Sequence, residues 1–275
     1  MDKLIITAAI SGAEVLKEHN PAVPYTIEEF VREAKSAFEA GASIIHLHVR
    51  QDDGTPTQDK ERFRVVMDAI YKACPGVIIQ PSTGGAVGMS NDERLQPTEL
   101  NPEMATLDCG TLNFGGDDIF ENTENTIKYF GKRMIERGIK PELEVFDKSM
   151  IDMALRLNKK GFIASPMHFD FVMGVNGGIS GELRDFVFLR GSIPSDATYT
   201  VAGVGRYEFP LAAAAIIDGG HVRVGLEDNV NISRGVLTSS NGELVAKVVR
   251  LAKEFGREIA NPDEARRILG IKKSI

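Results

Sequence analysis

The sequence lacks several features that would place it in common classes of protein. It has only two cysteines, Cys74 and Cys109, and they form no C-x-x-C spacing. Neither a disulfide framework nor a cysteine-based zinc site is therefore predicted. Lys and Arg number 32 against 39 for Asp and Glu, which leaves a formal net charge of −7. A broad basic face for nucleic acid or anionic lipid is not expected.

Long apolar runs are also missing. No stretch of about 18 apolar residues occurs, so no membrane span is predicted. The first residues, Met1-Asp2-Lys3-Leu4-Ile5, lack the apolar region of an export signal. With so little cysteine, we expect a protein of the reducing cytoplasm that acts on small molecules.

What the sequence contains is an alternation of short β-branched runs with stretches of helical spacing, repeated about eight times. The expected strands are residues 4–10, 43–49, 77–82, 104–109, 142–146, 162–167, 198–203 and 221–226. The expected helices are residues 26–40, 59–73, 92–95, 119–137, 149–159, 182–189, 207–218 and 243–258. No Pro-, Gly- or Ser-rich linker divides them. The first strand is followed by no G-x-G-x-x-G motif, which disfavours an open dinucleotide-binding sheet.

This alternation predicts an α/β fold, a (β/α)₈ TIM barrel that forms a single domain over residues 1–275, with a short C-terminal helix near residues 262–270. A Thr26-x-x-Glu29 pair predicts a capping box at the first helix. Gly41 and Gly138 are expected to end their helices. In such a barrel the active site lies where the strands end, at their carboxyl termini.

His46-Leu47-His48 closes the second expected strand. Side chains two apart on a strand face the same way, so both imidazoles point into one space. Two histidines in the core with ordinary hydrogen-bond partners would explain the motif equally simply. Their position at a strand end favours a divalent metal instead, which would need a third, anionic ligand.

The last expected strand offers such a ligand, because it runs from His221 into the adjacent acids Glu227 and Asp228. Either acid could reach the same centre, since the eighth strand of a closed barrel lies near the first two. A helix cap or a solvated turn is the alternative. Arg223 could hold Asp228 ionised as a base if the strand end bends, and a plain surface salt bridge is the alternative there.

A small polar segment, Ser82-Thr83-Gly84-Gly85, follows the third expected strand. Its amides and hydroxyls suit a carboxylate, phosphate or thioester oxygen, although a tight turn explains it equally well. Thr106 could add a donor near the end of the fourth strand. Glu144 is an acid in an apolar strand, where burial is costly unless the group is paired or protonated.

Taken together, these motifs resemble the family of β-keto acid cleavage enzymes, and the likeness spans essentially the whole chain. No good Ser-His or Cys-His nucleophile is present, which suits a family that needs none. The motifs that carry the resemblance are residues 6–14, His46-Leu47-His48-Val49-Arg50, Ser82-Thr83-Gly84-Gly85, residues 104–107 and 111–115, Pro141-Glu142-Leu143-Glu144 and residues 219–229.

The resemblance implies a zinc-bearing TIM barrel that moves CoA from acetyl-CoA to a fragment of a β-keto acid and releases acetoacetate. It implies His46, His48 and Glu227 as zinc ligands. It implies Asp228 and Arg223 as the pair that removes a proton from the substrate's C2. By the same resemblance Ser82, Thr106 and Glu144 surround the substrate, and the protein is a homo-oligomer, expected to be a homotetramer.

Glu14 bears on which β-keto acid is used. The founding activity of the family, in lysine fermentation, acts on 3-keto-5-aminohexanoate. An anionic side chain after the first strand could pair with the ammonium of that substrate. We therefore expect this substrate, with a solvated loop acid as the alternative.

Two other functions remain open at this point. A metal-dependent aldolase or hydrolase barrel can also carry H-x-H on an early strand, but that class generally takes further histidines from later strands. The expected fifth strand has no histidine. A barrel that only binds CoA or a small acid is the other alternative.

Overall fold

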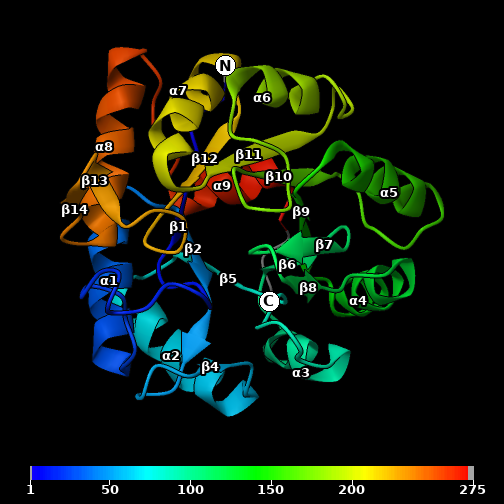
Figure 1. Ribbon diagram of the computed structural model, residues 1–275, viewed down its shortest axis with the longest axis horizontal. Coiled ribbons are helices and arrows are strands. Elements are labelled where there is room, and N and C mark those ends of the chain that lie inside the picture. The colour runs from blue at the N-terminus through cyan, green and yellow to red at the C-terminus, as the bar shows by residue number, and fades with distance from the viewer. Residues whose placement is uncertain (1, 272–275) are drawn as a thin grey trace.

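The computed structural model describes residues 2–271, so residue 1 and residues 272–275 of the expected 1–275 domain lie outside the described part. Eight parallel strands form a nearly closed barrel with helices around it (Figure 1), which confirms the predicted fold. Around the barrel the strands are β5 (Ile78–Pro81), β2 (Ile44–Leu47), β1 (Ile6–Ala9), β12 (His221–Val224), β11 (Thr198–Gly203), β10 (His168–Met173), β9 (Lys140–Val145) and β6 (Met104–Asp108).

The helices follow the strands along the chain. They are α1 (Ile27–Ala40), α2 (Lys60–Ala73), α3 (Asn91–Leu95) with η1 (Gln96–Leu100), α4 (Glu124–Arg137), α5 (Lys148–Lys159), α6 (Leu183–Arg190), η2 (Gly205–Tyr207) with α7 (Glu208–Asp218), α8 (Asn241–Glu254) and α9 (Pro262–Leu269). The predicted capping box at Thr26 and Glu29 forms. Gly41 and Gly138 end their helices at positive φ, as predicted. In the described residues no helix has the length and apolar character needed to cross a membrane.

Three short hairpins lie in the loops that follow strand ends. They are β3 (Val49–Arg50) with β4 (Pro56–Thr57), β7 (Leu112–Phe114) with β8 (Asp118–Phe120), and β13 (Asn231–Ser233) with β14 (Val236–Leu237). The helix expected over residues 119–137 was predicted too long, because its first residues belong to β8 and the helix begins at Glu124.

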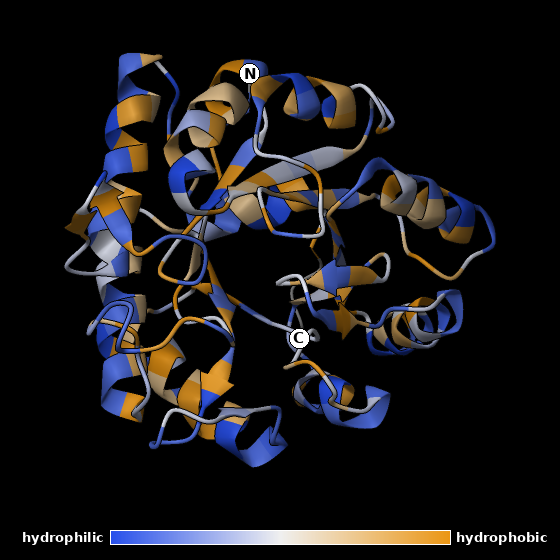
Figure 2. Ribbon diagram, in the orientation of Figure 1, coloured by the Kyte–Doolittle hydropathy of each residue, from blue (hydrophilic) through white to orange (hydrophobic). Residues whose placement is uncertain are grey.

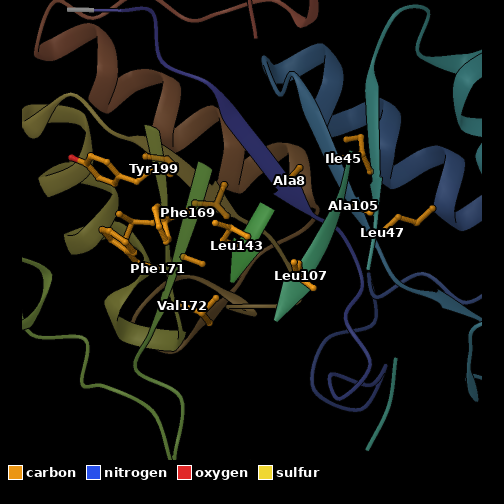
Figure 3. Packing of buried hydrophobic residues seen from close by; sticks show 14 of the residues in the cluster. Ala8, Ile45, Leu47, Ala105, Leu107, Leu143, Phe169, Phe171, Val172 and Tyr199 are labelled. Carbon is orange, nitrogen blue, oxygen red and sulfur yellow. The ribbon is translucent and has the colours of Figure 1, made fainter. Parts of the chain in front are cut away.

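Hydrophobic side chains fill the layer between the strands and the surrounding helices. Each helix carries both hydrophobic and hydrophilic residues, as amphipathic helices do (Figure 2). In this layer Ile45 and Leu47 of β2 and Phe169 and Phe171 of β10 are all buried (Figure 3). Phe171 stacks on Tyr199 with ring centroids 5.3 Å apart. This layer is the main core of the fold.

The inner face of the barrel differs between its two ends. At the amino ends of the strands lies an apolar base, which consists of Ile5, Ile44, Ile78 and Met104 packed against Ala260, Ala265, Leu269 and Ile271. Helix α9 supplies two of these residues and lies behind the strands in the view of Figure 1. Further up, the inner residues are polar and almost fully buried: Thr7, His46, Gln80, Thr106, Glu142, Asp170, Thr200 and Arg223.

The sixth strand corrects a prediction. Residues 162–167 were expected to form it, but β10 is His168–Met173, which begins just after the expected range. The alternation of His168 and Asp170 with Phe169 and Phe171 hid the strand, because its polar residues face a polar barrel interior. A strand with charged groups on a buried face reads as a loop when only apolar runs are counted.

Candidate active site

The carboxyl ends of the barrel strands open into a cavity of about 420 Å³. The loops after several strands contribute to its wall, as the fold predicts for an active site. Among its lining residues are Glu14, His48, Ser82, Gly85, Asp108, Phe120, Glu144, Val175, Arg223, Glu227 and Asp228. The loop that contains Gly174, Val175 and Asn176 also lines the cavity.

Two histidines and one glutamate meet beside this cavity, and two of them, His48 and Glu227, are lining residues. The His46 and His48 Nε2 atoms lie 3.4 and 3.5 Å from the Glu227 Oε1 atom. The two imidazoles come from the end of β2, and Glu227 comes from the loop after β12. Parallel pairing of β1 with both β2 and β12 brings these distant segments together. The structure thus brings together the three residues that the family resemblance implied as ligands, and of the two acids that the sequence left open, Glu227 faces the imidazoles.

The donor atoms of this cluster fit a divalent metal. Within residues 2–271, His46 Nε2 and Glu227 Oε2 are buried without a hydrogen-bond partner. On the other side of the His46 ring, Nδ1 lies 2.9 Å from the Gln80 Oε1 atom. A ring that donates its Nδ1 proton to Gln80 presents the Nε2 lone pair to the cluster, as in many metal sites. Two imidazoles and one carboxylate, with space left in the cavity, form the donor set of a catalytic zinc.

Arg223 connects these ligands to the predicted base. Its guanidinium donates to both Asp228 oxygens at 2.9 Å, to Glu144 Oε1 at 2.9 Å and to Glu227 Oε1 at 2.6 Å. Asp170 Oδ2 lies 3.5 Å from the same guanidinium. Arg223 is 3 % exposed and Asp228 7 %, so this is no surface salt bridge. Gly225 at φ 156° ends the strand and turns the chain, which gives the expected bend between Arg223 and Asp228.

The charges of these groups shift one another's pKa values. Burial alone would raise the pKa of Glu227, but Arg223 and the two imidazoles hold it well below its usual range. Burial raises the pKa of Asp228, and Arg223 opposes the rise. A carboxylate held ionised beside a cation but short of water is suited to accept a proton.

Two further acids, Glu144 and Asp170, lie beside Arg223. Burial, and next the Asp108 carboxylate, raise the pKa of Glu144 well above its usual range. Burial and Glu142 do the same to the pKa of Asp170. Neither oxygen of Asp170 has a hydrogen-bond partner among the described residues. We refer to Glu142, Glu144, Asp170, Arg223, Glu227 and Asp228 as the charged cluster.

The Gly-rich segment divides into two roles. Ser82 and Gly85 line the cavity, and Ser82 Oγ accepts from the Gly84 amide at 3.0 Å. Thr83 and Thr106 were expected there too, but neither is among the lining residues. The Thr83 amide donates to Thr106 Oγ1 at 3.1 Å, and Thr83 Oγ1 donates to the Thr106 carbonyl at 2.8 Å. β5 and β6 are the two edges of the sheet, so these bonds bridge the seam of the barrel.

Glu14 is exposed in the loop after β1 and lines the cavity. Among the described residues it takes no part in the hydrogen bonds of the charged cluster. Apolar lining residues include Phe114 and Phe120 of the β7–β8 hairpin and Phe146. Arg94 joins neighbouring segments, because it donates to the Thr83 carbonyl at 2.8 Å and to Asn122 Oδ1 at 2.7 Å. The cavity wall therefore combines acidic and apolar side chains.

Sequence reasoning missed Gln80 and Asp108. Gln80 is the strand partner of His46 in the β2–β5 pairing, and its side chain is fully buried. The available signal was an amide inside the apolar run Ile78-Ile79-Gln80-Pro81, which needs a polar partner when buried. Asp108 carries the same signal at the end of β6, where it is 3 % exposed.

The site lies at the carboxyl end of the barrel strands and combines a buried cluster of two histidines and a glutamate with a carboxylate held by an arginine. These features are typical of an enzyme with a TIM-barrel fold. Residues 3–271 match the model of the β-keto acid cleavage enzyme family, and the chain belongs to that family. It is 72% identical over 273 residues to a 3-keto-5-aminohexanoate cleavage enzyme of Fusobacterium nucleatum, with 99% of this chain and 100% of the relative covered.

More distant relatives share the full length as well. A 3-oxoadipate:acetyl-CoA acetyltransferase of Cupriavidus necator is 40% identical over 270 residues, covering 97% of this chain and 94% of the relative. Among solved structures, the binary complex of ObcA with oxaloacetate has a TM-score of 0.78 at 19% identity. It covers 92% of this chain and 68% of that one. This last likeness concerns the fold.

Proposed function

We propose that the protein is a zinc-dependent enzyme that converts 3-keto-5-aminohexanoate and acetyl-CoA into acetoacetate and 3-aminobutanoyl-CoA. The observation that carries the proposal is the contact between the His46, His48 and Glu227 cluster and the Arg223–Asp228 pair beside one cavity. The names of the relatives at 72% and 40% identity support the choice of keto acid and of acetyl-CoA.

His46, His48 and Glu227 would hold the zinc ion. Bound there, zinc supplies a Lewis acid that lowers the cost of removing a proton next to a carbonyl group. The rest of the ligand shell agrees with this role, because Gln80 fixes the orientation of His46 and Arg223 keeps Glu227 ionised.

Asp228 would accept the C2 proton of the β-keto acid. Its two oxygens are held by Arg223, which fixes the direction from which it approaches the substrate. Burial raises its pKa, so its carboxylate is more basic than an exposed Asp. The same group then returns the proton to the carbon of the leaving fragment.

The carbon chemistry balances without an enzyme nucleophile. The C2 carbanion attacks the acetyl-CoA carbonyl, a C–C bond forms, and CoA leaves as a thiolate. The thiolate adds to C3 of the keto acid, and the C2–C3 bond breaks. C1, C2 and the acetyl group leave as acetoacetate after C2 regains the proton from Asp228, and the remaining carbons leave as 3-aminobutanoyl-CoA.

The residues around the cavity would orient the substrates. Ser82, Gly85 and Glu144 line the cavity and would contact the keto acid directly. Thr83 and Thr106 would support them, because their hydrogen bonds fix the Gly-rich segment to β6. Glu14 would pair with the C5 ammonium from the rim. The homotetramer expected from the family is proposed as the assembly, to be measured by sedimentation.

A substrate panel tests this function. Zinc-loaded protein is assayed with acetyl-CoA and either 3-keto-5-aminohexanoate or 3-oxoadipate, and acetoacetate is measured. We expect turnover of the amino acid substrate to be at least about tenfold more efficient, since one well-placed charge pair changes recognition by that order. Acetoacetate formed only from 3-oxoadipate, or without acetyl-CoA, would contradict the proposal.

Replacement of Glu14 separates recognition from chemistry. Glu14→Gln should raise KM for 3-keto-5-aminohexanoate about tenfold and leave kcat nearly unchanged. The same variant should lower KM for 3-oxoadipate, whose distal group is anionic. An unchanged KM for the amino substrate would remove Glu14 from the ammonium site and leave the reaction class intact.

A further inference from the structure

The loop over residues 225–229 carries both Glu227 and Asp228, so its shape decides whether ligand and base reach the same centre. Each end of this loop is bonded to a buried side chain from another part of the chain. The Gly225 amide donates to Glu208 Oε1 at 3.0 Å, and the Asn229 side-chain amide donates to Glu208 Oε2 at 2.8 Å. One carboxylate thus bonds to both ends of the loop, in addition to the bond from the Asn229 backbone amide to the Gly225 carbonyl at 2.9 Å.

Glu208 opens α7 and is 1 % exposed. Among the described residues it forms no ion pair with Lys or Arg. Burying a carboxyl group without a cation is costly, and its two loop donors offset only part of that cost. A buried carboxyl group whose hydrogen bonds are satisfied fixes the positions of the groups that donate to it, here Gly225 and Asn229.

Other contacts hold the middle of the loop. The Leu226 amide donates to Asn241 Oδ1 at 2.9 Å, and the Glu227 amide donates to the Ala9 carbonyl at 3.1 Å. These bonds fix the loop to α8 and β1. Glu208 is the only side chain among the described residues that bonds to both Gly225 and Asn229.

We propose that Glu208 is a positioning residue, which holds the 225–229 loop so that Glu227 faces His46 and His48 while Asp228 faces the substrate. The inference rests on the proposed function, because it assigns Glu227 to zinc and Asp228 to proton transfer. It also gives a role to Gly225 and Asn229, the two ends of the loop, which take no part in the proposed chemistry but bond to Glu208.

An exchange of hydrogen-bond polarity tests the role. Glu208→Gln keeps the acceptor for the Gly225 amide but sets one NH₂ group against another at Asn229. Asn229→Asp sets two carboxylates together. The double variant lets the new amide at position 208 donate to the new carboxylate at position 229. Recovery should be partial, because the Asn229 amide also donates to the Asn231 carbonyl at 2.7 Å.

Two readouts follow the two residues on the loop. Zinc affinity, measured by competition with a chelating dye, reports on Glu227. Exchange of the C2 proton of 3-keto-5-aminohexanoate with D₂O, measured without acetyl-CoA on zinc-saturated protein, reports on Asp228. Each single variant should lower zinc affinity by about tenfold or more and slow the exchange, and the double variant should recover about half of each loss on a logarithmic scale.

Glu103→Gln is the matched control. Glu103 is another carboxylate with two bonds, to Arg266, but it precedes β6 at the opposite end of the barrel. This variant should lower the melting temperature and leave zinc affinity and proton exchange unchanged. If Glu208→Gln does not fold, Asn229→Ala removes one bond to Glu208 without changing α7, and should reduce both readouts less strongly.

The outcomes separate the two proposals. Wild-type protein that neither binds zinc nor exchanges the proton overturns the proposed function and the inference with it. If the wild type binds zinc and exchanges the proton, and Glu208→Gln has the same zinc affinity and exchange rate, only the inference about Glu208 is overturned. A double variant no better than the single ones also overturns it, since loss without recovery is what general destabilisation gives.

Discussion

The apolar base and the charged cluster occupy opposite ends of the same barrel interior, and they are built from opposite kinds of side chain. The base is closed by α9 and includes Ile44, Met104 and Leu269, all at most 1 % exposed. The cluster consists of five acids around Arg223, and Arg223 is the cation that forms ion pairs with four of them. The same strands therefore stabilise the fold at one end and gather charge at the other.

This difference indicates how stability and function are divided. Burial of apolar surface lowers the free energy of the folded state, whereas burial of unpaired carboxylates raises it. Among the described residues neither oxygen of Asp170 has a hydrogen-bond partner, its ion pair with Arg223 being 3.5 Å long, and Glu142 has one oxygen without a hydrogen-bond partner. We infer that the apolar base stabilises the fold and offsets the unfavourable free energy of the buried charged cluster. Substitutions at the base should therefore change mainly stability, and substitutions at the cluster mainly catalysis.

The largest expected effect is on catalysis at the cluster. Asp228→Asn removes the proposed base, so kcat should fall by roughly 10²–10⁴-fold, the usual contribution of such a group. Zinc affinity should change by no more than a few fold, because Asp228 is not one of the three ligands. Steady-state kinetics and a zinc titration measure the two effects, and near-normal turnover would exclude Asp228 as the base.

The next effect concerns the base. Leu269→Ala should lower the free energy of unfolding by about 2–5 kcal/mol, because a cavity replaces a buried side chain. Folded protein should keep its zinc affinity and kcat. Leu237→Ala, at a leucine that is 50% exposed in β14, serves as control and should change stability by less than about 0.5 kcal/mol. Urea unfolding measures both, and equal losses would contradict the assignment of the base.

A smaller effect is expected where the polar interior supports a ligand. Gln80→Leu removes the acceptor for His46 Nδ1 and should weaken zinc binding roughly 10–100-fold. Gln80→Glu keeps an acceptor at the same place and should bind zinc more tightly than Gln80→Leu does. Dye competition measures the order of affinities. If both variants bind like the wild type, Gln80 does not orient His46.

The smallest expected effect is on the pH dependence of the free energy of unfolding, which reflects the burial of acids in the charged cluster. Burial raises the pKa of Asp170 in the folded state, so the folded protein holds this proton more tightly than the unfolded chain. Stability from this group is thus present at low pH and is lost as pH rises through the range between the two pKa values. Asp170→Asn stays neutral, so its stability relative to wild type should rise from pH 4 to pH 8. Urea unfolding at both pH values measures this, and a difference independent of pH would contradict it.

Local patterns predicted much of the fold. The repeated alternation gave the barrel, and seven of its strands lie at or within the expected ranges or overlap them closely. The capping box at Thr26 and the ends at Gly41 and Gly138 depend on neighbouring residues alone, which is why they were predictable. The strand at His168–Met173 was missed because its polar face is buried against other strands, a fact that its own sequence does not contain.

The candidate site, like the fold, was predictable where local sequence patterns decide the geometry and not where distant parts of the chain meet. The H-x-H spacing places His46 and His48 on one face, and that geometry is local. Thr83 and Thr106 were expected in the cavity, yet they bridge the seam between β5 and β6. Only the position of the seam decides which of the two roles a threonine has there. Asp108 was overlooked although it is an acid at the end of an apolar strand, because the groups it meets in the cavity come from other parts of the chain.

By itself, the sequence determined the period of its elements, the ends of its helices and the pairing of two imidazoles on one strand face, since each depends on backbone geometry over a few residues. The tertiary structure alone decided which distant groups meet: Gln80 with His46 through strand register, and Glu208 with the loop that carries Glu227 and Asp228. The reason is physical, because the free energy of a buried polar group depends on partners that folding brings from elsewhere in the chain.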